Sequence, residues 1–288
     1  MNFIKKYICE LVFVINLFLV IPNHDFKVWW QRPIINDAFG YYVYLPAVFI
    51  YHDLGYDFMQ QPIEKYYKDI ANDKPKGAFV VNFKGKEVNK YPPGVAYFHA
   101  PFFFLAHLTA KITGGPADGY SDLYMYFMSF SAIFWQYIFL ILLRKIFKFY
   151  SLSIDAHALT AVFLAFGTNL YFYTQHFGSY SHLYSLLSIS LFFYGGIQFF
   201  RNPGISQSKK YFFIMCIGMA LALVVRNLNV LALLFLPVMG FKLKELKNYF
   251  QVLKTKTGIT ALLTSLSIVF SMLLFWKIQS DYWLIDSY

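Results

Sequence analysis

One carboxylate, Asp37, lies in an aromatic stretch, Ile34–Pro46, that begins shortly after the first long apolar run ends. A carboxylate can accept the proton of a hydroxyl group that it reaches. Single cations stand beside other apolar segments, since Lys90 precedes a Pro-Pro pair and Arg226 precedes Asn229 in "VVRNLN". Positioned Lys and Arg side chains bind phosphate and stabilise negative charge. These residue types could act as a proton acceptor and as binding groups for an anion.

Each of these residues also has a purely structural explanation. An aspartate before an aromatic helix commonly caps that helix, so Asp37 alone favours a cap over a base. Arg226 in an apolar stretch is costly unless it is paired or faces water, and a helix-end arginine can extend its charge to the membrane surface. A lysine just outside an apolar segment, such as Lys90, is often only an interface anchor. We keep both interpretations for each residue.

The histidines and tyrosines leave similar alternatives. His176 and His182 flank a Gly-Ser break, where a histidine is more often a hydrogen-bonded structural residue than a donor to phosphate or sugar. Tyrosines form belts at membrane interfaces, and this explains most of the 24 in the chain. The pair Tyr41 and Tyr42 could also stack on a sugar or on a prenyl chain. The sequence does not separate these roles.

The elements that position these residues are apolar helices. Of the 288 residues, 58% are hydrophobic and 14% are charged, whereas a soluble domain carries about 25% charged residues. Apolar blocks of about 18 or more residues with almost no charge predict transmembrane helices. We therefore predict an all-α polytopic membrane protein of seven to eight apolar helices, forming one domain over 1–288. We expect an uncleaved first span ending near Ile21-Pro22, and then blocks at 94–113, 122–143, 156–173, 182–200, 211–225, 228–241 and 257–276.

Basic clusters at the ends of the blocks predict the orientation. They contain Lys5 and Lys6; Arg144, Lys145 and Lys148; Arg201, Lys209 and Lys210; and Lys242, Lys244, Lys247, Lys254 and Lys256. Positive charge marks cytoplasmic loops, which explains the net charge of +10 without nucleic acid. The loop 23–91 then lies outside, bearing interfacial helices in its first half and a polar hairpin in its second. For all clusters to share one side, the block 94–113, with its internal Pro101, should not cross fully; the alternative is that Arg144-Lys145 is an exception to this charge rule.

This arrangement places the chemistry-bearing residues on one face. Asp37, Lys90, His182 and Arg226 fall on the non-cytoplasmic side with much of the tyrosine, whereas the cytoplasmic side carries a solvated basic rim. The segments "NDAFGYY", "KYPPG" and "VVRNLN", in this order and on this side, resemble the GT-C membrane glycosyltransferases. The similarity is to the bacterial branch related to protein O-mannosyltransferases and aminoarabinose transferases, and it extends over essentially the whole chain.

The resemblance implies transfer of a sugar from a polyprenyl-phosphate donor to an acceptor glycan, lipid or protein at the outer face of a bacterial inner membrane. It implies Asp37 as the general base, with Lys90, Arg226, Asn229, His182, Tyr41 and Tyr42 as candidate substrate-binding residues. The chain departs from the family in two ways. Asn36 stands where many members have a second acid, and "FWKIQSDYWLIDSY" looks like the start of a loop leading to further helices, so we expect a C-terminally truncated member.

Two other classes stay open. A transporter or flippase for a lipid-linked or anionic substrate also uses broken helices and a buried arginine, but the halves of this chain show no internal repeat. An inactive truncated membrane protein is the third alternative. No His, Cys or Asp spacing matches a metal site, so we predict none, although a divalent ion at Asp37 is left open because some relatives use one. The expected partners are the lipid-linked sugar, its acceptor and the bilayer, without nucleic acid.

Overall fold

The computed structural model describes residues 2–23, 26, 28, 31–68, 76, 79–201 and 205–285. The N-terminal part consists of α1 (Asn2–Lys6) and α2 (Ile8–Asn23), followed by α3 (Asp37–Tyr42), α4 (Tyr44–Pro46), the π-helix η2 (Ala47–Tyr51), the 3-10 helix η3 (Asp57–Met59), α5 (Gln60–Tyr66), and the strands β1 (Val80–Phe83) and β2 (Lys86–Asn89). The remaining helices are α6 (Gly94–Thr113), α7 (Asp122–Phe149), α8 (Ile154–Phe166), α9 (Asn169–Gln175), α10 (Ser181–Arg201), α11 (Ile205–Val225), the 3-10 helix η4 (Asn227–Phe235), α12 (Leu236–Met239), the 3-10 helix η5 (Leu243–Glu245), α13 (Leu246–Leu253) and α14 (Lys256–Ser280).

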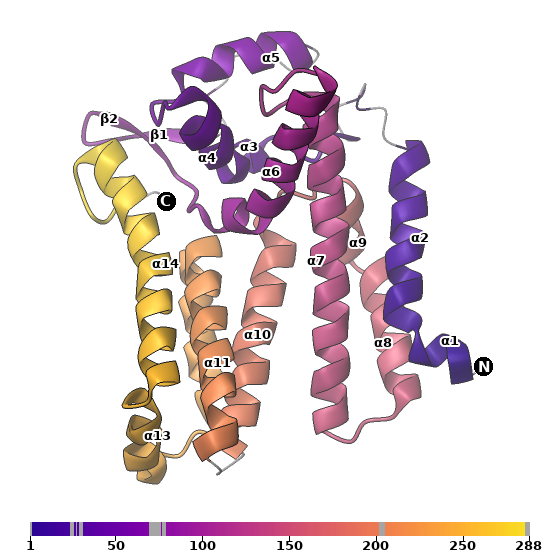
Figure 1. The fold of residues 1–288 in the computed structure, drawn as a ribbon, viewed down its shortest axis with the longest axis vertical. Coiled ribbons are helices and arrows are strands. Elements are labelled where there is room, and N and C mark those ends of the chain that lie inside the picture. The colour runs from indigo at the N-terminus through magenta and orange to yellow at the C-terminus, as the bar shows by residue number, and fades with distance from the viewer. Residues whose placement is uncertain are drawn as a thin grey trace.

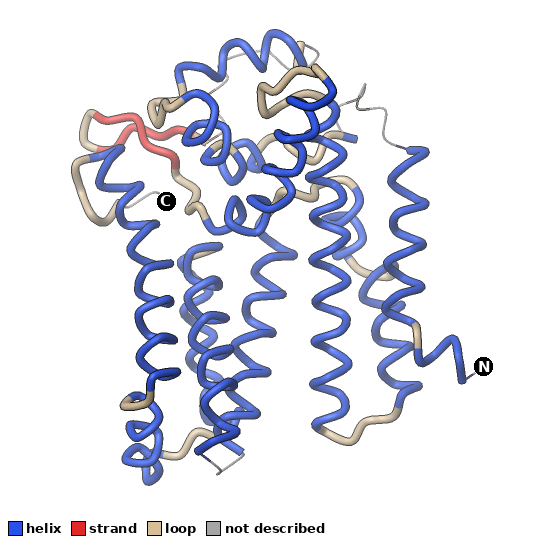
Figure 2. Tube along the Cα trace, in the orientation of Figure 1, coloured by secondary structure: helices blue, strands red, loops and turns tan. Residues whose placement is uncertain are grey.

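The architecture is a bundle of long helices with a cap of short elements at one end (Figure 1). The chain is 76% helical, and the two strands form one antiparallel hairpin in which Val81 pairs with Val88. Figure 2 shows this hairpin beside the C-terminal end of α14, within the cap. The all-α prediction and the hairpin in the second half of the loop are thus confirmed.

Four helices are long and apolar enough to cross a membrane: α7, α10, α14 and residues Ser208–Val225 of α11. Shorter apolar helices cover Ile8–Val20, Ile154–Phe166 and Asn227–Met239. The seven to eight predicted apolar segments are therefore present as helices, and within the described residues four of them have the length and composition of a full span.

Two segments differ from the predicted blocks. The block 156–173 is divided between α8 and α9, because Thr168 starts a new helix by accepting a hydrogen bond from the backbone N–H of Leu170. The block 228–241 is mostly the 3-10 helix η4. A 3-10 helix rises about 2.0 Å per residue instead of 1.5 Å, so this short segment extends further along the bundle than an α-helix of equal length.

Helix α6 runs beside only the first part of α7. The indole Nε1 of Trp135 donates a 2.9 Å hydrogen bond to the carbonyl oxygen of Phe98, and nearer the other end Nδ1 of His107 lies 2.6 Å from the hydroxyl of Tyr124. These pairs make α6 antiparallel to the first half of α7, so α6 begins partway along the bundle and ends where α7 begins (Figure 1).

The four basic clusters consequently gather at the end of the bundle opposite the cap (Figure 1). Arg144 donates a 3.1 Å hydrogen bond to the carbonyl oxygen of Lys6. Arg201 donates one of 3.1 Å to the carbonyl oxygen of Val238, which joins the end of α10 to α12. The aromatic ring of Tyr249 in α13 packs on Phe200, with ring centroids 5.1 Å apart. This shared end agrees with the charge pattern of the sequence.

Candidate active site

Asp37 is the first residue of α3 and its carboxylate is not used for capping. The residue that precedes the helix is Asn36, which has φ 50° and ψ −122° and makes no capping hydrogen bond through its side chain. Positive φ is uncommon in residues other than glycine. Asp37 is half-buried, and among the described residues its carboxylate has no ion pair and no hydrogen-bond donor. A carboxylate in this state is available to a ligand.

Helix α3 is fixed against the segment that carries Lys90. Gly40 permits the close approach, because a Cβ there would lie 2.3 Å from the Tyr91 ring. The amide of Asn89 donates a 2.7 Å hydrogen bond to the carbonyl oxygen of Gly40, and the hydroxyl of Tyr44 donates one of 2.6 Å to that of Tyr91. The "NDAFGYY" and "KYPPG" segments therefore form one packed unit.

Lys90 lies at the edge of this unit. Its Nζ is 5.0 Å from the centroid of the Tyr91 ring, within the range of a cation–π contact. The Tyr91 ring in turn packs on Tyr41, with centroids 4.5 Å apart. Tyr41 is one helical turn after Asp37, so both residues lie on the same side of α3. Lys90 is thus held on the side of α3 that carries Asp37.

The turn between α9 and α10 brings a second set of side chains to α3. Tyr173 stacks on His182, with ring centroids 4.0 Å apart and an interplanar angle of 25°. Tyr180 interacts with both Asn36 and Asp37: burial raises the pKa of its phenol, a hydrogen bond with Asn36 lowers that pKa, and the negative charge of Asp37 raises it. The phenol therefore stays protonated and can donate a hydrogen bond.

Arg226 and Asn229 approach the same place from the end of α11. Asn229 donates hydrogen bonds of 3.0 Å to the Ser185 hydroxyl and 2.9 Å to the carbonyl oxygen of Ala222. Arg226 is exposed, and within the described parts of the chain its guanidinium has no acidic partner. His182 interacts electrostatically with both Arg226 and Asp37. The two charges predicted to share one face thus both lie near the first turn of α10.

A buried chain of hydrogen bonds holds the turn between α9 and α10 in place. The Tyr184 hydroxyl donates a 2.6 Å hydrogen bond to the carbonyl oxygen of Gly178 and lies 3.2 Å from Nε2 of His99. Nδ1 of His99 is 2.9 Å from the Ser131 hydroxyl. Because the single Tyr184 proton goes to Gly178, Nε2 of His99 must be the donor to Tyr184 and Nδ1 the acceptor from Ser131. Sequence reasoning missed His99, Tyr180 and Tyr173, whose partners are distant in the sequence.

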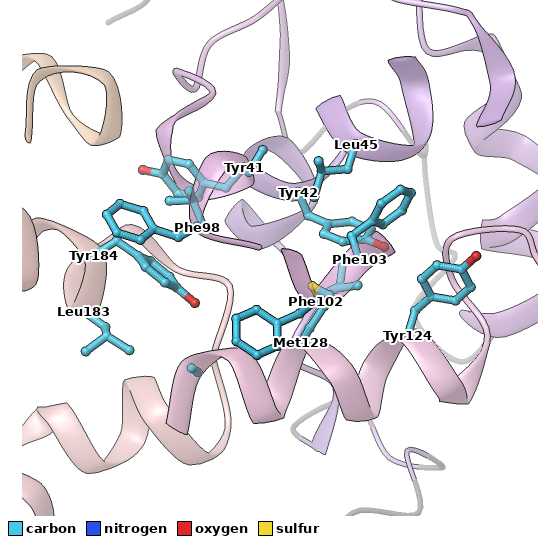
Figure 3. Close-up of a cluster of buried hydrophobic side chains, with 14 of the residues drawn as sticks. Tyr41, Tyr42, Leu45, Phe98, Phe102, Phe103, Tyr124, Met128, Leu183 and Tyr184 are labelled. Carbon is cyan, nitrogen blue, oxygen red and sulfur yellow. The ribbon is translucent and has the colours of Figure 1, made fainter. Parts of the chain in front are cut away.

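Tyr41 and Tyr42 are part of the core rather than of an open surface. Tyr42 is fully buried, and its hydroxyl donates a 2.6 Å hydrogen bond to the carbonyl oxygen of Gly119. Tyr41 is 2% exposed. Figure 3 shows both within a cluster of buried side chains, in which the rings of Phe98 and Tyr184 lie 5.2 Å apart. These two tyrosines pack beneath the site, and their side chains have no exposed surface that could bind a sugar.

The arrangement combines one free carboxylate with two cations, a histidine and a protonated phenol. Within the described residues no three His, Cys, Asp or Glu side chains gather in a way that could hold a metal ion. A carboxylate can take a proton from a hydroxyl, and Arg or Lys can stabilise a phosphate that leaves. No protein-family model matches the chain, and comparisons with curated proteins and with solved structures give no match.

Proposed function

We propose that the chain is a polytopic membrane glycosyltransferase that uses a polyprenyl-phosphate sugar as donor. The observation that carries the proposal is the proximity of two opposite charges. The free carboxylate of Asp37 and the exposed cation Arg226 both lie near His182, in the first turn of α10. The acceptor is a hydroxyl group of a glycan, lipid or protein. The site lies at the capped end of the bundle, opposite the basic clusters, which supports a location on the extracytoplasmic face of a bacterial inner membrane.

In the proposed reaction, Asp37 takes the proton of the acceptor hydroxyl as that oxygen forms a bond to the anomeric carbon of the sugar. The bond between this carbon and the phosphate oxygen breaks, and polyprenyl phosphate leaves with the electron pair. Arg226 stabilises the leaving phosphate, and Lys90 adds a second positive charge. No second acid is needed, because a phosphate ester is already a good leaving group. His182 and Tyr180 donate hydrogen bonds to the sugar or to the phosphate in this proposal.

The test uses inner-membrane vesicles from bacteria that express the chain and vesicles that lack it. Both are incubated with radiolabelled polyprenyl-phosphate sugars, and polyprenyl phosphate release and transfer of labelled sugar are measured together. We expect release and transfer to rise together only in vesicles with the chain. A transporter would instead move the intact lipid-linked sugar across the bilayer without cleaving it. Movement without cleavage, or no chain-dependent cleavage of any donor, would contradict the proposal.

A further inference from the structure

An apolar cavity lies far from the candidate active site, near the basic end of the bundle. It has a volume of about 450 Å³ and is lined by residues of α10, α11, η4, α12, α13 and α14. Several lining side chains are also exposed at the surface of the bundle, among them Phe250 (58% exposed), Leu266 (62%) and Leu233 (40%). The cavity is therefore open sideways, toward the space that a bilayer would fill, and its wall matches a hydrocarbon chain.

Helix α13 closes this cavity at the basic end and is amphipathic. Leu246, Tyr249, Phe250 and Leu253 recur at the spacing of one helical face, and all four line the cavity. A short amphipathic helix with an apolar face and lysines beside it is typical of a segment that lies in the membrane interface. The apolar face of α13 is thus turned to the cavity.

Three lysines of this region directly follow cavity-lining residues in the sequence. Lys242 follows the lining residue Phe241, Lys247 follows Leu246, and Lys254 follows Leu253. All three are exposed, as are Lys244 and Lys256. Among the described residues from 241 to 256 the single acid is Glu245. Basic clusters beside a membrane helix attract anionic lipid headgroups, so the charge at this rim complements a phosphate joined to an acyl chain.

We propose that this cavity and its lysine rim form a binding site for an anionic phospholipid. One acyl chain occupies the apolar cavity between α11, α13 and α14, and the headgroup phosphate lies among Lys242, Lys247 and Lys254. The site is separate from Asp37. The inference rests on the membrane location in the proposed function but not on its chemistry. A lipid-binding experiment can therefore contradict the lipid site without contradicting glycosyl transfer, and a transfer assay can contradict glycosyl transfer without contradicting the lipid site.

The test is native mass spectrometry of the full chain in detergent, titrated with phosphatidylglycerol or with phosphatidylcholine of the same acyl chains. We expect phosphatidylglycerol to bind more tightly. The triple variant Lys242→Gln, Lys247→Gln, Lys254→Gln should lose about fivefold in affinity per lysine, equivalent to about 1 kcal/mol each. The matched control Lys6→Gln, Lys145→Gln, Lys148→Gln removes the same charge from the same end of the bundle and should retain the affinity.

A second variant tests the cavity itself. The hydroxyl of Ser265 lines the cavity and has no hydrogen-bond partner among the described residues, so Ser265→Phe fills the cavity without removing a hydrogen bond. It should weaken both lipids while keeping their order. Equal binding of the two lipids by the wild type would show that the headgroup charge is not recognised, and equal losses in the two triple variants would show that the attraction is diffuse; either result would overturn the proposal. Competition by glycerol phosphate, which lacks acyl chains, would assign the rim to a soluble phosphate and also overturn it.

Discussion

The amide of Asn229 donates a 3.0 Å hydrogen bond to the hydroxyl of Ser185, and this contact joins the segment after Arg226 to the helix that carries His182. Asn229 also donates to the carbonyl oxygen of Ala222, at the end of α11. One side chain therefore fixes the break between α11 and η4 against α10. The break is a defined part of the site, and its polar backbone is held by protein contacts, as irregular backbone among membrane helices requires.

The first prediction concerns this contact. Ser185→Ala removes one hydrogen bond and should cost about 1 kcal/mol in the free energy of unfolding, whereas Asn229→Ala removes two and should cost more. Thermal unfolding of the purified protein in detergent measures both effects. The double variant should be less destabilised than the sum of the single variants, because the two residues share a bond. Additive losses would show that the bond contributes nothing.

The second prediction concerns Arg226. Because its side chain is exposed and has no acidic partner in the described structure, Arg226→Gln should change the free energy of unfolding by less than about 0.5 kcal/mol. It should weaken donor binding by about 10- to 100-fold, the equivalent of a charge-assisted hydrogen bond. Equilibrium binding of a fluorescent polyprenyl-phosphate sugar measures the loss. Lys111→Gln, an exposed cation near the end of α6, is the control. Equal donor affinity in the Arg226 and Lys111 variants would remove the phosphate role.

The third prediction concerns the buried histidine. His99→Phe deprives Tyr184 and Ser131 of partners in the core and should cost about 1–3 kcal/mol for each group left unsatisfied. His107→Phe, on the same helix, loses a single bond to Tyr124 at a half-buried position and should cost less. Unfolding in detergent compares the two. If His99→Phe were the milder variant, the chain from Ser131 to Gly178 would not support the turn.

The fourth prediction concerns the course of the chain. Gly115 lies between α6 and α7 in the cap, and Tyr150 lies at the basic end. In intact cells, a membrane-impermeant thiol reagent should label Gly115→Cys from outside, and Tyr150→Cys only after the membrane is opened. Native Cys9 is fully buried and Cys216 can be replaced by serine. The reverse pattern, with Tyr150→Cys labelled from outside and Gly115→Cys only after the membrane is opened, would contradict the half-length path of α6.

Helix boundaries were predictable where the sequence carries strong local signals. The block 94–113 matches α6 because Pro92 and Pro93 precede its start and Gly114, with φ 70°, ends it. The sequence Gly-Thr-Asn at Gly167 is a common helix end followed by an N-cap residue. The division was nevertheless not predicted, because the residues on both sides are apolar and look like one continuous block. The 3-10 geometry of η4 was not predictable, because an apolar run specifies burial or lipid contact rather than the hydrogen-bond register of its backbone.

The position of the site at one end of the bundle was predictable, but its contacts were not. Lysine positions alone placed Asp37, Lys90 and Arg226 at one end of the bundle, because charge bias at helix ends fixes the direction of each crossing. The contact of Tyr180 with Asn36 and Asp37 depends on how α3 packs against the turn before α10. Such a contact joins residues that are far apart in the sequence, and one amino-acid sequence taken alone does not show which distant residues will meet.

The central claim is that Asp37 accepts the proton of the acceptor hydroxyl. Asp37→Asn keeps the size of the side chain but cannot take a proton, so transfer should fall by about 100- to 10,000-fold. Asp122→Asn is the matched control, because Asp122 is an exposed aspartate in the first turn of another helix at the capped end. In vesicles with equal amounts of each variant, we predict loss of sugar transfer for Asp37→Asn and wild-type transfer for Asp122→Asn. Undiminished transfer by Asp37→Asn would contradict the account.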